Sequence, residues 1–151
     1  MLEKRIPPVA LVLIVGFLMW LIAEVGPRVE VGQTLRLAVA IAFFLLGALI
    51  ALAGVLAFRS SRTTVDPRKP ETTSALVSWG VYRYSRNPMY VGFALWLLAW
   101  GVFLASAWAL IGVVVFVIYM NRFQIAPEEC ALRELFGKEF QEYERRVRRW
   151  L

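Results

Sequence analysis

The segment from Gly80 to Gly92 gathers tyrosine, arginine, serine and asparagine side chains directly before a long uncharged stretch. Arginine and asparagine can hold an anionic or polar ligand through hydrogen bonds, and tyrosine offers a hydroxyl group together with an aromatic face. A pair of carboxylates, Glu128 and Glu129, follows shortly after the end of the same uncharged stretch. Because a stretch that crosses a membrane and returns brings its two flanks to one surface, we predict that these groups form one candidate site there.

The composition indicates a small membrane protein. The chain has 151 residues, of which 60% are hydrophobic and 19% are charged, whereas soluble domains are about 45–50% apolar. Its one cysteine, Cys130, excludes an intramolecular disulfide, and it contains no histidine. Histidine is the commonest metal ligand and the usual general base near neutral pH, so we expect no metal site and exclude zinc and Ser-His-Asp hydrolases.

Three uncharged runs are long enough to cross a hydrocarbon core of about 30 Å as helices. They cover residues 6–23, 37–58 and 87–121, which are 18, 22 and 35 residues long. As one helix the last run would extend about 52 Å, so we expect it to fold back at Ala105-Ser106-Ala107, where small residues permit a tight reversal. No small-residue cleavage pattern closes the first run, which favours a span over a cleaved signal peptide. The sequence therefore predicts an all-α integral membrane protein with four transmembrane helices, the last two forming a short hairpin, at about residues 6–23, 37–58, 88–104 and 106–121.

The charges give this topology an orientation. With four spans, only Arg28 and Arg36 of the 17 lysine and arginine residues fall on one side of the membrane. Basic residues accumulate on the cytoplasmic side, so we expect both termini to be cytoplasmic. The net charge of +6 then reflects topology and contact with membrane lipids, and we expect no nucleic acid partner.

Two polar segments complete the predicted architecture. The cytoplasmic loop between Arg59 and Arg86 is too polar to span, and we expect it to pack under the C-terminal tail. The tail from Pro127 to Leu151 is predicted as one amphipathic helix, with its carboxylates and its basic cluster at the dipole ends that suit them. Gly137 interrupts this pattern and predicts a kink.

The ordered motifs resemble those of the isoprenylcysteine carboxyl methyltransferase family, and phospholipid N-methyltransferases and thiol S-methyltransferases share much of the pattern. The resemblance rests on Gly80-Val81-Tyr82, Arg86-Asn87-Pro88-Met89-Tyr90-Val91-Gly92, Glu128-Glu129, Leu132, Phe136-Gly137 and Tyr143. It covers about residues 63–151, whereas the first two spans match only in being apolar. It implies a single membrane methyltransferase domain over residues 1–151, which transfers a methyl group from S-adenosylmethionine to an acceptor arriving from the lipid phase.

The resemblance also implies which residues form the site. The cofactor-binding residues would be Ser74, Ala75, Leu76, Val77, Tyr82, Asn87, Pro88, Met89, Tyr90, Glu128 and Glu129. Arg86, Tyr90 and Glu128 would act in catalysis. Either glutamate can pair with the ammonium group of the cofactor, Tyr82 can face its adenine or sulfonium, and Arg86 can bind its carboxylate. Methyl transfer depends on positioning and on exclusion of water, so it does not require a histidine.

Two positions depart from the prenylcysteine-specific members of that family. Those members have histidine at the position of Asn87, and they have a substrate-binding arginine at the position of Gln124. Gln124 is therefore the predicted substrate-binding residue. Because an amide binds a carboxylate less strongly than an arginine does, these departures favour a small apolar or lipid-like acceptor without a carboxylate.

Other interpretations of the same residues stay open. Asn87-Pro88 can simply start a helix, tyrosines collect at membrane interfaces, and glutamates suit a first helical turn. The alternative function is a non-enzymatic small membrane protein whose C-terminal helix docks a partner. Sterol reductases have a related fold, but they are longer. The oligomeric state is undetermined, because Gly47, Ala51 and Gly54 allow a close helix contact within one chain or between two.

Overall fold

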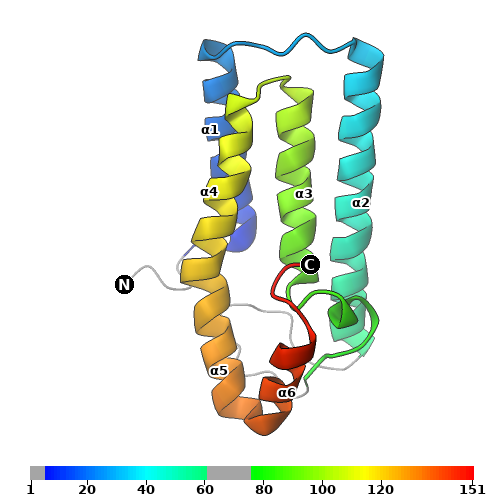
Figure 1. The fold of residues 1–151 in the computed structure, drawn as a ribbon, viewed down its shortest axis with the longest axis vertical. Coiled ribbons are helices and arrows are strands. Elements are labelled where there is room, and N and C mark those ends of the chain that lie inside the picture. Colours follow the sequence, from blue (N-terminus) through cyan, green and yellow to red (C-terminus); the bar gives the residue numbers. More distant parts are fainter. Residues whose placement is uncertain (1–5, 61–75) are drawn as a thin grey trace.

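The computed structural model describes residues 6–60 and 76–151, and within these residues every regular element is helical. In chain order the elements are α1 (Pro8–Val25), α2 (Gln33–Ser60), η2 (Gly80–Arg83), α3 (Pro88–Phe103), η3 (Trp108–Leu110), α4 (Ile111–Tyr119), η4 (Met120–Ile125), α5 (Ala126–Phe136) and α6 (Lys138–Arg146). The helices α1 to α4 run side by side. The α1–α2 linker and the α3–α4 turn lie at one end of this bundle, whereas α5, α6 and the C-terminus lie toward the other (Figure 1).

Three helical segments are long and apolar enough to cross a membrane: α1, α2 and the continuous helix Trp108–Phe136. The helix α3 is apolar as well, but its 16 residues extend only about 24 Å. Large side chains such as Leu13 and Leu49 are more than half exposed on the isolated chain, which suits helices surrounded by lipid. The predicted all-helical membrane protein is confirmed, and its exact number of spans stays a prediction.

The chain reverses where the sequence predicted, between α3 and η3. Ala105 in this turn has a φ of 51°, a left-handed conformation that few residues other than glycine adopt. Its carbonyl accepts a hydrogen bond of 2.7 Å from the backbone N–H of Val29. The reversal is therefore tied to the α1–α2 linker, and both connections at this end of the bundle stabilise each other.

The predicted ends of the last span and of the tail helix are wrong. The helix does not stop near Asn121, because α4 continues through a wide π-helical turn, η4, directly into α5. The tail does not form one helix from Pro127 to Leu151. It is interrupted at Gly137, where the sequence predicted a kink, because no α-helix accommodates the φ of 53° at this residue. The second piece, α6, ends at Arg146, and the backbone at Val147 is extended.

The helices α2 and α3 lie in backbone contact through glycines. A Cβ atom added at Gly92 would lie 2.6 Å from the carbonyl oxygen of Gly47 and 2.9 Å from the Cβ of Ala51. A Cβ at Gly47 would likewise lie 2.7 Å from the carbonyl oxygen of Gly92. The small residues of α2 thus face α3 within the same chain, which is the first of the two possibilities that the sequence left open.

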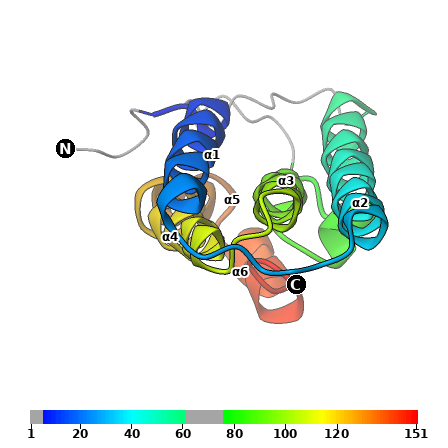
Figure 2. The ribbon, with the colours of Figure 1, turned by 90° about the horizontal axis from the view of Figure 1, so that it is seen from above.

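The other side of α3 packs against α1 and α4, so that α3 separates this pair from α2 (Figure 2). Met19 of α1 is fully buried, and its side chain occupies the space that a side chain at Gly101 or Gly112 would need. Trp100 crosses from α3 to α1, where its indole N–H donates a 2.9 Å hydrogen bond to the carbonyl of Gly16. This packing fixes the start of α3 relative to the end of α4, and both of these ends carry polar residues of the predicted site.

We predict that Gly92→Ala destabilises the protein by about 1–3 kcal/mol, the usual range for overpacking, because the new methyl group meets backbone that cannot yield. The measurement is thermal unfolding in detergent. Gly16→Ala is the matched control, since its Cβ would find its nearest neighbours at 3.9 Å and should be neutral or stabilising. Equal melting temperatures for the two variants would contradict the glycine contact.

Candidate functional site

A buried carboxylate, Glu129, lies at the centre of the polar end of the molecule. Its side chain is 5% exposed and accepts a 2.6 Å hydrogen bond from Nη2 of Arg86. Arg149 adds a second ion pair, with its Nε at 3.0 Å and its Nη2 at 2.5 Å from the two carboxylate oxygens. Hydrogen bonding to Glu129 raises the pKa of Arg149, against the opposing effect of burial. Three segments far apart in sequence are thereby joined at one carboxylate.

Arg86 is held by the C-terminal part of the chain on its other side too. Its Nη1 donates to the carbonyls of Glu144, at 3.1 Å, and Val147, at 2.8 Å. Its backbone N–H donates to the carbonyl of Arg148. All terminal nitrogens of the guanidinium therefore contact the protein itself.

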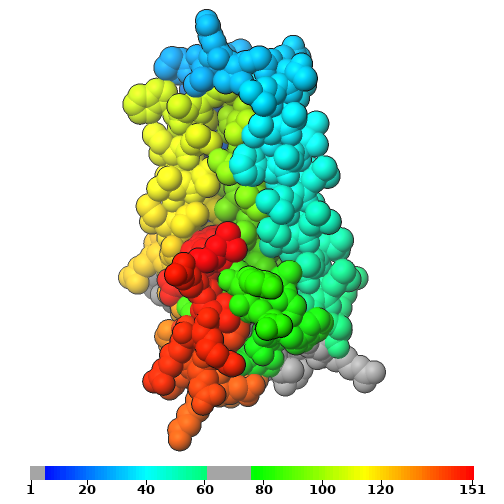
Figure 3. Space-filling view, turned by 45° about the vertical axis from the view of Figure 1, so that its right-hand side comes forward, coloured from blue at the N-terminus to red at the C-terminus, as the bar shows by residue number. Residues whose placement is uncertain are grey.

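The last five residues, 147–151, form a C-terminal strap that lies across the Ser85–Asn87 segment. The side-chain amide of Asn87 donates a 2.9 Å hydrogen bond to the carbonyl of Arg149. The indole N–H of Trp150 donates a 2.9 Å hydrogen bond to Oδ1 of Asn121 in η4. Figure 3 shows the C-terminal residues lying against the segment that precedes α3. The strap thus connects the start of α3 with the end of α4.

The second glutamate has different neighbours. Glu128 is partly buried, and its Oε1 accepts a 2.9 Å hydrogen bond from the hydroxyl of Tyr90. The amide of Gln124, which is buried in the η4 turn, donates to the same oxygen. The wide turn places Gln124 and Glu128 on the inner side of the continuous helix, and π-helical turns of this kind are frequent at functional sites. Glu128 is therefore oriented by two uncharged donors, one from α3 and one from η4.

Tyr82 carries a buried hydroxyl with no hydrogen-bond partner among the described residues. Its ring packs edge-on against Phe58 of α2, with centroids 5.2 Å apart, and its carbonyl accepts a 2.7 Å hydrogen bond from the hydroxyl of Tyr143. Burial raises the pKa of Tyr82 well above its ordinary value of 10.0, and Tyr143 and the charge of Glu128 raise it further. The hydroxyl therefore stays protonated and remains a hydrogen-bond donor at physiological pH.

The other predicted site residues surround these groups. Pro88 opens α3, Met89 lies beside Gly54 of α2, and Val77 is buried in the apolar cluster that contains Tyr82. Leu76 packs at the edge of that cluster. Ser74 and Ala75 lie outside the described residues.

Sequence reasoning missed two residues of the site, Arg149 and Ser85. Ser85 is buried, and its hydroxyl oxygen accepts a 3.1 Å hydrogen bond from the backbone N–H of Asn87. Arg149 belongs to a run of basic residues at the end of the tail, and nothing in the sequence distinguishes it from Arg148 or Arg146. Only the position of the strap brings this one arginine to Glu129.

Comparison with known sequences agrees with this geometry. Residues 35–139 match the profile of the phospholipid methyltransferase family, which is well over half of the chain. The chain belongs to this family. The match includes α2, α3, both glutamates and the η4 turn, so it covers most of the residues that meet at the candidate site.

The chain is also similar to individual proteins. An uncharacterized protein of Haemophilus influenzae is 46% identical over 63 residues, which are 42% of this chain and 100% of that protein. A probable protein-S-isoprenylcysteine O-methyltransferase of Oryza sativa is 36% identical over 80 residues, or 51% of this chain and 40% of the relative. Protein-S-isoprenylcysteine O-methyltransferase B of Arabidopsis thaliana is 30% identical over 106 residues, or 68% of this chain and 52% of the relative. No solved structure matches.

These findings confirm the resemblance inferred from the motifs. They place the chain in a family of methyltransferases, which supports an enzyme and not the alternative of a partner-docking protein. The chain spans about half the length, or less, of the plant relatives that it matches. The methyltransferase activity that the names of these relatives give is therefore the starting point of a proposal for this chain.

We predict that Glu129→Ala strongly destabilises the fold, because it leaves the charges of Arg86 and Arg149 without their buried partner. Breaking one side of a buried ion pair costs about 3–5 kcal/mol, which thermal unfolding in detergent would measure. Glu134→Ala is the control, since this glutamate is exposed on the same helix. A melting temperature of Glu129→Ala equal to that of the control would show that the ion pairs do not hold the strap.

Proposed function

We propose that this protein transfers a methyl group from S-adenosylmethionine to a lipid-like acceptor at the cytoplasmic face of a prokaryotic inner membrane. The observation that carries the proposal is the convergence of Tyr82, Tyr90 and Glu128 at the end of an apolar helical bundle. One of these residues has a buried donor without a partner among the residues that the structure describes, and another is a carboxylate oriented by its neighbours. Family membership supports the reaction class.

The residues fit the chemical groups of the cofactor. The protonated hydroxyl of Tyr82 can donate to its carboxylate or to a ribose oxygen, and Glu128 can pair with its ammonium. The ring of Tyr90 is an aromatic surface of the kind that attracts a cation. When bound, S-adenosylmethionine supplies an electrophilic methyl group on a sulfonium. The tasks left to the protein are to bind, to orient and to exclude water.

We assign different roles to the two glutamates, which the sequence alone did not distinguish. The carboxylate of Glu129 is already bound by Arg86 and Arg149, so we propose that Glu129 holds the strap in place. Glu128 is the proposed cofactor ligand. Arg86, predicted from the sequence to contact the cofactor, donates its terminal nitrogens to Glu129 and to two backbone carbonyls, so we propose that it is a positioning residue.

The acceptor is proposed to reach the site from the lipid phase, between helices that are apolar up to the level of Gln124. Gln124 donates to Glu128, so an acceptor at Gln124 would lie next to the cofactor ligand. The relatives named isoprenylcysteine O-methyltransferases and the phospholipid methyltransferase profile both support a lipid-like acceptor. Four spans with both termini in the cytoplasm would place the basic end of the chain and the site at the same membrane face.

We predict that Tyr82→Phe weakens the binding of S-adenosylhomocysteine by about tenfold, the scale of one hydrogen bond of roughly 1.4 kcal/mol. Because the hydroxyl has no partner among the described residues, the variant should keep the melting temperature of the wild type. Calorimetric titration of the detergent-purified protein measures this affinity. Tyr84→Phe is the matched control, since Tyr84 is 75% exposed.

Glu128→Gln tests the second half of the proposed site in the same titration. Binding should be lost or reduced more than in Tyr82→Phe, because an amide cannot form an ion pair with the ammonium of the ligand. The proposal requires saturable binding of about one ligand per chain by the wild type. A folded wild type that binds no S-adenosylhomocysteine, or Glu128→Gln with wild-type affinity, would contradict it.

We predict that the affinity for S-adenosylhomocysteine has no step assignable to Tyr82 between about pH 6 and 9. The raised pKa keeps this hydroxyl protonated throughout that range, and the chain contains no histidine that would titrate within it. Because burial disfavours the ionised form, Tyr82 adds no pH dependence to the stability of the fold below pH 10.0, its ordinary pKa, and the stability declines as the pH rises further. Calorimetric titration with S-adenosylhomocysteine at several pH values, with Tyr82→Phe for comparison, measures the pH dependence of the affinity. A change of affinity in the wild type that Tyr82→Phe abolishes would refute the prediction.

A further inference from the structure

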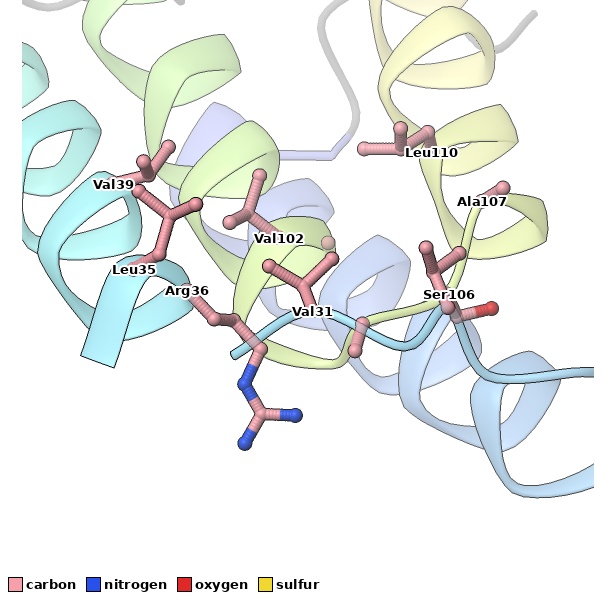
Figure 4. A pocket seen from close by; sticks show the side chains of 11 residues that line it. Val31, Leu35, Arg36, Val39, Val102, Ser106, Ala107 and Leu110 are labelled. Atoms are coloured by element: carbon pink, nitrogen blue, oxygen red, sulfur yellow. The ribbon is translucent and has the colours of Figure 1, made fainter. Parts of the chain in front are cut away.

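A cavity lies at the opposite end of the bundle from the candidate site. It has a volume of about 300 Å³, at the lower end of the range for ligand pockets. Its walls come from the α1–α2 linker, the first turns of α2, the end of α3 and the α3–α4 turn. Figure 4 shows aliphatic side chains gathered around it, among them Val31, Leu35, Val39, Val102 and Leu110. The cavity therefore suits a hydrocarbon chain and not a polar solute.

The mouth of this cavity continues into apolar surface. Val31 and Leu35 line the cavity and are 42% and 62% exposed. Leu35 belongs to α2, which is long and apolar enough to cross a membrane, so the acyl chains of a surrounding membrane can reach the cavity beside it. A lipid chain could enter it without leaving a hydrocarbon environment.

Arg36 lies at the rim of the cavity, and the contacts of the described residues do not account for its positive charge at this position. It forms no ion pair and no side-chain hydrogen bond with the described residues, and its Nε is buried without a partner. Its guanidinium carbon lies over the ring of Phe103, 6.0 Å from the ring centroid. Arg36 also occupies the first turn of α2, where the helix dipole disfavours a cation.

The neighbouring charges do not neutralise Arg36. Arg28 is paired with Glu24 at 3.5 Å, and Glu30 forms no ion pair within the described residues. In Figure 4 the stem of Arg36 follows the rim of the cavity while its guanidinium points away from the aliphatic side chains. This arrangement presents an apolar slot and a hydrogen-bonding cation side by side, which is the complement of a molecule with a hydrocarbon chain and an anionic head.

We propose that this cavity binds one anionic phospholipid of the surrounding membrane, with an acyl chain in the cavity and the phosphate at the guanidinium of Arg36. Arginine matches a phosphate group with two parallel donors, and basic pockets between membrane helices bind anionic head groups. The bound lipid supplies the counter-ion that Arg36 lacks among the described residues. It also fills the space between the α1–α2 linker and the α3–α4 turn. This site is separate from the proposed methyl-transfer site and does not depend on it.

The test is lipid retention, measured by native mass spectrometry after extraction from vesicles of palmitoyl-oleoyl phosphatidylglycerol and phosphatidylcholine mixed in equal amounts. The wild type should retain about one phosphatidylglycerol per chain. Arg36→Gln should lower that retention about tenfold or more, the scale of one charge-assisted hydrogen bond. Arg28→Gln, the matched control at the same end of the bundle, should retain the lipid as the wild type does, because Arg28 already has a partner.

Filling the cavity tests the position of the acyl chain. Val31→Trp places a large ring at the mouth and should reduce phosphatidylglycerol retention, whereas Val25→Trp, at a residue that is 92% exposed and outside the cavity, should not. Inorganic phosphate at millimolar concentration should not displace the lipid, since it lacks the hydrocarbon contacts. Displacement by phosphate alone would mean that the cavity takes no part and would overturn the proposal.

The proposal is also overturned if Arg36→Gln retains as much phosphatidylglycerol as the wild type, or if the wild type retains phosphatidylcholine equally well. Melting temperatures of all four variants establish that a loss of lipid is not a loss of fold. Titration with S-adenosylhomocysteine provides an independent readout, because Arg36→Gln leaves the residues of the methyl-transfer site unchanged. Failure of lipid retention and failure of the proposed enzymatic function are therefore distinguishable.

Discussion

The polar end of this protein depends on the neutralisation of one buried carboxylate. Glu129 is removed from solvent, and a carboxylate in that position is tolerated only when cations and hydrogen bonds replace its lost hydration. Arg86 and Arg149 provide both, and they come from the segment before α3 and from the last residues of the chain. Satisfying Glu129 therefore requires the C-terminal strap to lie across the start of α3. The rest of the candidate site is arranged around that constraint.

The position of Glu128 follows from that of Glu129. Two consecutive residues of a helix point about 100° apart, so fixing one carboxylate toward the strap turns the other toward a different neighbour. In this chain that neighbour is Tyr90 in the first turn of α3, with Gln124 adding a donor from the η4 turn. The wide turn also carries Asn121, which accepts the indole N–H of Trp150. One helical irregularity thus supports both the strap and the carboxylate that we propose as the cofactor ligand.

The two ends of the bundle are built on different principles. At the polar end, the buried Glu129 is paired with Arg86 and Arg149, and the buried hydroxyl of Tyr82 has no partner among the described residues. At the far end, Arg36 lies beside an apolar cavity, and its buried Nε has no partner in the part of the chain that the structure describes. Between them, the glycine contact of α2 with α3 holds the helices close and leaves most of α2 facing lipid. This division is consistent with a protein that performs chemistry at one membrane surface and meets lipid everywhere else.

The sequence by itself determined the helical membrane class, the reversal at Ala105-Ser106-Ala107 and the two motifs that meet at the site. Each of these follows from local properties: the length of an uncharged run, small residues where a tight turn is needed, and polar groups that flank an apolar stretch. The resemblance to a methyltransferase family rested on the same local order of residues, and the family profile confirmed it.

Only the tertiary structure decided which glutamate is buried, where the chain leads after the break at Gly137 and which arginine of the basic tail meets Glu129. An ion pair between positions 129 and 149 depends on how α6 and the strap fold back, and that path is set by the positive φ of Gly137 and by the packing of Phe140 and Tyr143 against Tyr82. The sequence analysis also failed to predict that α4 continues into α5 as one helix. A change from apolar to charged residues marks the end of a hydrophobic run, but backbone hydrogen bonds can continue through it.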